Sequence, residues 1–262
     1  MNMELPRNTF KHALKGDRPL FGLWSSIAGA YAIEALAGAG LDWLMLDAEH
    51  SPNSLQTVLS SLQVLAAYPT QAVVRLPLND MVMIKQYLDI GVQTLLIPQI
   101  NTAEEARLAV AYTRYPPHGL RGVGGTTRAT RFGRIPGYAQ RAHEELCILV
   151  QVESREALDN LEEIAAVEGI DGVFIGPADL HASLGYVGQT RNPDVIPLMD
   201  EAVRRIQRAG KPAGTLLTGD AEDGMRWVRN GTRFIAVGSD LGLMARGAER
   251  LVEDWHSRIA AQ

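Results

Sequence analysis

The chain has 262 residues, of which 46% are hydrophobic and 21% charged, and its formal net charge is −5. This length allows one full hydrophobic core, and about 250 residues is the usual size of a single α/β barrel. Acidic and basic residues are interspersed, so nothing indicates nucleic acid or a membrane surface as a partner.

The single cysteine, Cys147, lies in an apolar run and excludes an intramolecular disulfide, which favours a reducing compartment. Residues 1–16 lack the apolar segment of a signal peptide, and no run of 18 apolar residues occurs. The sequence therefore predicts a soluble cytoplasmic protein that forms one domain over residues 1–262.

Apolar runs typical of strands alternate with amphipathic segments typical of helices along the whole chain. In chain order, the predicted strands are 19–25, 43–48, 72–76, 94–98, 147–152, 172–175, 213–217 and 234–237. The predicted helices are 8–14, 31–37, 54–66, 81–88, 103–112, 156–166, 194–209, 222–230 and 241–259. Residues 115–136 are the only long irregular stretch, and we expect a lid or a subunit contact there.

Eight strands that alternate with helices predict a parallel sheet covered by helices, and the number favours a closed (β/α)8 TIM barrel over an open doubly wound sheet. The active site of such a barrel lies at the C-terminal ends of the strands. The polar residues predicted there are the candidates for chemistry: Trp24, Asp47, Glu49, His50, Arg75, Gln151, Glu153 and Asp179.

Two acidic residues follow consecutive strands, Glu153 after the fifth and Asp179 after the sixth. Taken singly, Glu153 could be a first-turn acid favoured by the helix dipole, and Asp179 could be a helix N-cap. Neighbouring parallel strands lie about 4.8 Å apart, so both carboxylates could also bind one divalent cation. Their occurrence together, with Gln151 one alternation earlier, favours a hard ion such as Mg²⁺ or Mn²⁺.

Two further candidates, a histidine and an arginine, lie at other predicted strand ends. His50 is placed to act as a general base if a carboxylate partners its imidazole, and Asp47 and Asp89 are the candidates for that partner. Arg75 interrupts a buried strand, so it either forms an ion pair inside the barrel or projects at its mouth, where a guanidinium suits an oxyanion or a carboxylate.

Lysine provides a negative result. All four lysines lie on predicted helices or just before a strand, whereas a Schiff-base lysine projects from a strand into the barrel: Lys11, Lys15, Lys85 and Lys211. Imine chemistry is therefore disfavoured. The glycine-rich residues 119–125 do not match a phosphate-binding loop and indicate a turn, and residues 237–240 predict a capped helix start.

The chain contains the motifs LDAEHSPN, VVRLP, KQYLDIGVQTLLIPQI, RYPPHGLRGVGG, VQVESREA, VEGIDGVFIGPADL and AVGSD. Together these motifs resemble the HpcH/HpaI aldolase family over residues 10–250. The resemblance is strongest to the 4-hydroxy-2-oxoheptanedioate aldolases and the 2-keto-3-deoxy-sugar-acid aldolases of that family. It implies a class II pyruvate aldolase on a (β/α)8 barrel, with Mg²⁺, Mn²⁺ or Co²⁺ as cofactor, a 2-oxoacid and an aldehyde as small-molecule partners, and a role in aromatic compound catabolism.

The resemblance also implies residue roles. Glu153 and Asp179 match the metal ligands, His50 matches the general base paired with the match at Asp89, and Arg75 matches the arginine that steadies the enolate. Gln151, Gly176 and Ala178 match the pyruvyl-binding positions, while Trp24 and Leu216 fall around the pocket. The family is typically a homohexamer, a trimer of dimers that exchange the last helix.

Two departures from the family pattern concern the aldehyde half of the substrate. His181 stands where a serine is common, and residues 124–132 form a shorter loop. Two rival functions stay open: a citrate-lyase-like enzyme acting on a thioester, and a catalytically silent barrel that serves as a binding protein. A thioester lyase needs a site for coenzyme A, and no basic run for its phosphates is evident.

Overall fold

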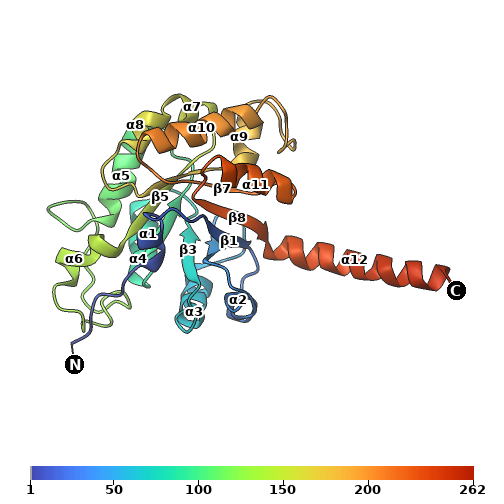
Figure 1. The fold of residues 1–262 in the computed structure, drawn as a ribbon. Coiled ribbons are helices and arrows are strands. Elements are labelled where there is room, and N and C mark those ends of the chain that lie inside the picture. The colour runs from blue at the N-terminus through green and yellow to red at the C-terminus, as the bar shows by residue number, and fades with distance from the viewer. Residues whose placement is uncertain (1) are drawn as a thin grey trace.

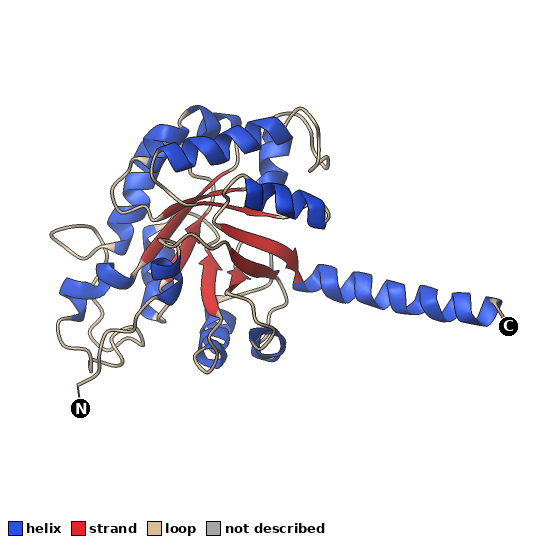
Figure 2. Ribbon diagram, in the orientation of Figure 1, coloured by secondary structure: helices blue, strands red, loops and turns tan. Residues whose placement is uncertain are grey.

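A computed structural model describes residues 2–262 and contains a closed barrel of eight parallel strands. Each strand pairs with the next, and β8 pairs with β1 to close the sheet. Helices surround the barrel, and the last helix leaves it to end in solvent (Figures 1 and 2). The predicted (β/α)8 barrel is therefore confirmed.

The strands are β1 (Leu20–Ser25), β2 (Trp43–Asp47), β3 (Gln71–Arg75), β4 (Thr94–Ile97), β5 (Cys147–Val152), β6 (Gly172–Ile175), β7 (Ala213–Leu216) and β8 (Phe234–Ser239). The helices are α1 (Thr9–Ala13), α2 (Ala30–Ala37), α3 (Leu55–Leu65), α4 (Met81–Asp89), α5 (Ala103–Thr113), α6 (Tyr138–Glu145), α7 (Arg155–Asp159), α8 (Leu161–Ala165), α9 (Pro177–Ser183), α10 (Ile196–Arg208), α11 (Ala221–Arg229) and α12 (Asp240–Ala260).

Two apolar clusters hold these layers together. The larger lies between the strands and the surrounding helices, and the smaller fills the barrel interior. The Phe10 ring of α1 closes the N-terminal end of the barrel, with its centroid 6.0 Å from the rings of both Trp43 and Phe234. The absent Cβ of Gly22 leaves the space that the Trp43 indole occupies. A packed N-terminal end leaves the C-terminal end of the barrel for chemistry.

Three helical segments differ from the prediction. The predicted helix 156–166 is two short helices, α7 and α8, because Asn160 leaves helical geometry at φ −97° and ψ 10°. Helices α6 and α9 were not expected. Helix α9 has seven residues, and two turns are too short to show a helical period in the sequence.

Helix α12 projects from the barrel and carries large apolar side chains that are more than half exposed. They lie at helical spacing along its length: Met244, Leu251, Trp255 and Ile259. Within residues 2–262, no helix is long and apolar enough to span a bilayer. Cys147 is a free, buried thiol inside the barrel.

Candidate active site

Strands β1, β2 and β3 bring Trp24, Asp47 and Arg75 together at their C-terminal ends. Arg75 donates from Nε and Nη2 to the two carboxylate oxygens of Asp47, at 2.8 and 2.7 Å. Its Nη1 lies 2.8 Å from Glu49 Oε2, and its guanidinium carbon is 4.6 Å from the centre of the Trp24 ring. Burial opposes ionisation of Asp47, but hydrogen bonds and charge from Arg75 lower its pKa.

Arg75 was expected either to form an ion pair inside the barrel or to lie at its mouth, and the structure combines the two. The side chain forms a buried bidentate ion pair, and it does so at the last residue of β3, where the barrel opens. A guanidinium has five N–H groups, and two of them, on Nε and Nη2, donate to Asp47. The N–H groups that remain on Nη1 and Nη2 are available to an oxyanion, and the Asp47 pair fixes their orientation.

His50 follows β2 at the barrel mouth and is exposed. Its backbone N–H donates to Asp47 Oδ1 at 3.3 Å, and the Asp47 oxygens are also bound by Arg75 and Trp24. Asp47 therefore already pairs with other side chains and is not the partner of the His50 imidazole. Asp89 ends α4, five residues before β4 begins, and therefore lies at the opposite end of the barrel. Within one chain the structure does not bring His50 and Asp89 together.

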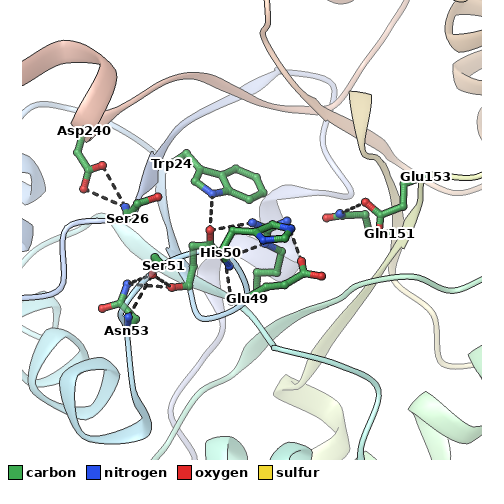
Figure 3. Close-up of polar contacts among 11 residues, drawn as sticks. Trp24, Ser26, Glu49, His50, Ser51, Asn53, Gln151, Glu153 and Asp240 are labelled. Carbon is green, nitrogen blue, oxygen red and sulfur yellow. Dashed lines mark hydrogen bonds and ion pairs between the residues drawn. The ribbon is translucent and has the colours of Figure 1, made fainter. Parts of the chain in front are cut away.

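Glu153 and Gln151 form the other side of the mouth, opposite His50 and Glu49 (Figure 3). Gln151 Nε2 donates to Glu153 Oε2 in a very short hydrogen bond, and the backbone N–H of Gln99 donates to Glu153 Oε1 at 2.9 Å. Burial raises the pKa of Glu153 to about 7 against these bonds, and the negative charges of Asp179 and Glu49 add to the rise.

The two structural alternatives for the acids are not what the structure shows. Glu153 precedes the N-cap of α7, which is Ser154, whose hydroxyl accepts from Ala157 N. The N-cap of α9 is Gly176, and Asp179 lies exposed in the first turn of that helix. Asp179 is close enough to Glu153 for its charge to raise the pKa of that carboxyl. Because β5 pairs with β6, the two acids follow neighbouring strands of the barrel.

The donor set fits a hard divalent cation. Glu153 and Asp179 supply carboxylate oxygens, and Gln151 Oε1 is a buried oxygen without a hydrogen-bond partner. No group of three His, Cys, Asp or Glu side chains in residues 2–262 is arranged to bind a metal. Two protein carboxylates with the remaining positions left to water and substrate oxygens is the arrangement typical of Mg²⁺.

Two backbone features position Glu153. Gln99, which sequence reasoning missed, has a left-handed backbone at φ 54°, a strained conformation that directs its N–H to Glu153. Gly176 packs so tightly that a Cβ there would lie 2.5 Å from Glu153 Oε2 and 3.1 Å from Gln151 Nε2. The close approach explains why a residue without a side chain follows β6.

We expect Gly176→Ala to lower metal affinity and turnover by about ten- to a hundredfold, the typical effect of disturbing groups that orient a metal ligand. Its backbone, at φ −84°, tolerates alanine, so the effect comes from displacement of Glu153 and Gln151. Titration calorimetry and initial rates measure it. Gly38→Ala is the matched control, since its φ is −86° and a Cβ there meets only Tyr68 Cε1, at 4.0 Å. Equal behaviour of the two variants would contradict the positioning role.

The other predicted positions lie around the same mouth. Ala178 is exposed in the first turn of α9, and Leu216 ends β7 partly buried. Two of the lysines contact backbone at the N-terminal ends of strands. Lys11 Nζ donates to Leu146 O at 2.6 Å, directly before β5, and Lys211 Nζ donates to Ile170 O at 2.7 Å, two residues before β6.

His181, the departure from the family pattern, is fully buried in α9. Its Nδ1 lies 2.6 Å from Pro177 O and, as the only possible donor of this pair, donates to that carbonyl. Nε2 has no partner. The imidazole therefore supports the helix that carries Asp179, and it does not line the mouth.

Comparisons with known proteins identify the family of the chain. The family model for HpcH/HpaI aldolase/citrate lyase matches residues 20–247. A pyruvate aldolase from Rhizobium etli is 54% identical, covering 95% of this chain and 98% of its own. A 4-hydroxy-2-oxo-heptane-1,7-dioate aldolase from Salmonella dublin is 53% identical over 94% and 93%. A solved HpcH/HpaI aldolase/citrate lyase family structure from Burkholderia cenocepacia has a TM-score of 0.91 at 40% identity, covering 95% and 99%. The chain belongs to the HpcH/HpaI aldolase/citrate lyase family.

Proposed function

We propose that the protein is a class II, metal-dependent pyruvate aldolase, a carbon–carbon lyase that cleaves a 4-hydroxy-2-oxoacid to pyruvate and an aldehyde. The observation that carries this proposal is the pair of carboxylates, Glu153 and Asp179, at the ends of β5 and β6 across the mouth from Arg75. The names of the two relatives support it. A thioester lyase has no comparable support from the mouth residues.

Glu153 and Asp179 would hold the cation, with Mg²⁺, Mn²⁺ and Co²⁺ as candidates. When bound, such an ion polarises the 2-oxo group of the substrate and stabilises negative charge on its oxygen. Gln151, Gly176 and Ala178 bind the pyruvyl half by their position beside these acids. Trp24 and Leu216 form the wall of the pocket and exclude water.

His50 takes the proton from the C4 hydroxyl of the substrate. The C3–C4 bond then breaks, its electron pair passes to the pyruvate half as an enolate, and C4 leaves as the carbonyl carbon of the aldehyde. Asp47 holds the Arg75 side chain in place, and the remaining N–H groups on its Nη1 and Nη2 meet the enolate oxygen. Reprotonation at C3 gives pyruvate, and the reverse sequence condenses pyruvate with an aldehyde.

His50 needs a carboxylate partner, and we propose that Asp89 of a neighbouring subunit provides it. Asp89 lies on a face whose nearby loop exposes Leu120 and Val123, with 55% and 75% of their surface accessible. Apolar side chains this exposed are typical of a subunit contact. A homohexamer, a trimer of dimers, brings this face to the mouth of another chain, and the exposed stripe of α12 supports exchange of that helix within each dimer.

Pyruvate release from 4-hydroxy-2-oxoacids tests the function. We expect release to stop in excess chelator and to return when Mg²⁺, Mn²⁺ or Co²⁺ is added back, because no lysine is placed for an imine route. A lactate dehydrogenase couple measures the pyruvate. Undiminished release in chelator would exclude a class II enzyme, and no release with any metal or substrate would favour a binding protein.

A second substrate separates the roles of the site residues. Oxaloacetate loses CO₂ by cleavage of its own C3–C4 bond and yields the same enolate, but it has no C4 hydroxyl proton to remove. Its decarboxylation therefore requires the cation and Arg75 and does not require a base. The ratio of retro-aldol to decarboxylation rates reports on His50 and its partner alone.

A further inference from the structure

Arg121 is a fully buried charge in the glycine-rich residues 119–125, to which neither the fold nor the proposed reaction gives a role. Its Nη2 donates to Asp89 Oδ1 at 2.7 Å. Its Nε and Nη1 are buried and have no hydrogen-bond partner among residues 2–262. Buried donors are usually satisfied, so an arginine kept in this state requires an explanation.

An aromatic enclosure fixes the orientation of this guanidinium. Its carbon lies 4.5 Å above the centre of the Tyr115 ring and 6.0 Å from that of Tyr138. The two rings meet edge to face at 6.4 Å. Burial raises the pKa of Tyr115 to about 12, so the ring stays neutral and presents its electron-rich face to the cation. Stacking on the rings partly replaces the missing hydrogen bonds.

Only one oxygen of Asp89 is bound by this arrangement. Oδ1 accepts from Arg121, whereas Oδ2 has no hydrogen bond among the described residues and the side chain is 23% exposed. A Cβ at Gly124 would lie 3.5 Å from Oδ2 and 2.8 Å from Thr127 Cγ2, so the loop passes close to Asp89 without covering it. The carboxylate is therefore held at one oxygen and left open at the other.

We propose that Arg121 is a positioning residue, which holds Asp89 by Oδ1 so that Oδ2 can receive the imidazole of His50 from a neighbouring subunit. The inference rests on the proposed aldolase function and on the shared site. A lysine cannot replace this arginine, because an ammonium lacks the planar surface that stacks on Tyr115. The role of the turn in residues 119–125 is then to place Arg121 where it can donate to Asp89.

The test compares retro-aldol cleavage with oxaloacetate decarboxylation in Arg121→Met and Arg121→Lys. We expect the retro-aldol kcat to fall about ten- to a hundredfold, as for a misplaced catalytic group, while decarboxylation falls less than about twofold. Arg134→Met is the matched control, since the side chain of this exposed arginine donates to the backbone carbonyl of Arg131 and does not contact Asp89. Arg121→Lys guards against misfolding, because it keeps the buried charge.

A double-mutant cycle with Asp89→Asn gives the second readout. If Arg121 acts through Asp89, the Arg121→Met, Asp89→Asn enzyme is about as slow in retro-aldol cleavage as Asp89→Asn alone. An equal fall of both activities in both Arg121 variants would show a structural role and overturn the proposal, as would wild-type retro-aldol rates. In either case the metal-dependent activity of the wild type would still stand.

Discussion

Glu153→Gln is expected to lower pyruvate release by about a thousandfold, equivalent to about 4 kcal/mol of transition-state stabilisation supplied by the cation. The substitution keeps the shape of the side chain and its contacts with Gln99, but it removes one of two anionic ligands. Oxaloacetate decarboxylation should fall as far as retro-aldol cleavage, because both reactions need the ion. Metal titration followed by calorimetry and the two rates measure the effect.

The raised pKa of Glu153 adds a pH dependence to this prediction. A carboxyl with a pKa of about 7 holds its proton below that pH, so proton and cation compete, and metal affinity of the wild type should fall as pH drops through 7. The stability of the metal-free protein depends on pH in the opposite direction. The folded state binds this proton more tightly than the unfolded chain does, so stability is lost as pH rises from about 4.5 to about 7.

Thermal unfolding of chelator-treated protein separates this contribution from others. The difference in Tm between wild type and Glu153→Gln should change over that pH range, with the variant gaining relative to the wild type as pH rises. Glu156→Gln, an exposed glutamate in the first turn of α7, is the control and should match the wild type in every measurement. A Glu153→Gln enzyme with normal metal affinity would remove Glu153 from the ligand set.

The barrel was predictable because its signals are local. Each strand is a short apolar run, and several strands end in or are soon followed by polar residues. The fixed direction of strands in a (β/α)8 barrel places these residues at one mouth. Glu153, Asp179, Arg75 and His50 were found by this rule. Helix α9 was not, because seven residues beginning at a proline carry no helical period.

The features that position the site could not be read from the sequence. The Gln99 N–H reaches Glu153 only because of a left-handed backbone, and 32 residues separate Arg121 from Asp89. Neither relation has a local pattern. The barrel rule does place Asp89, the last residue of α4, at the end opposite His50. His50 and Asp89 can therefore pair only between two chains, with one residue supplied by each chain.

His50→Ala is expected to lower retro-aldol cleavage by about a hundred- to ten-thousandfold, the usual contribution of a general base. Oxaloacetate decarboxylation and metal affinity should stay close to the wild type, because His50 donates only its backbone N–H to the Asp47 cluster and alanine retains it. His118→Ala, an exposed histidine of the long loop, is the control. Equal loss of both activities would remove His50 from the base role.

Mixing two inactive variants tests whether the base and its carboxylate come from different chains. His50→Ala and Asp89→Asn subunits, unfolded together and refolded as hybrids, should regain retro-aldol activity that neither variant shows alone. An intact site then forms wherever His50 of an Asp89→Asn chain meets Asp89 of a His50→Ala chain. If both groups acted within one chain, no hybrid could contain an intact site, and the mixture would be no more active than its components. Activity of the mixture therefore decides between one chain and two, independently of how strongly each substitution acts.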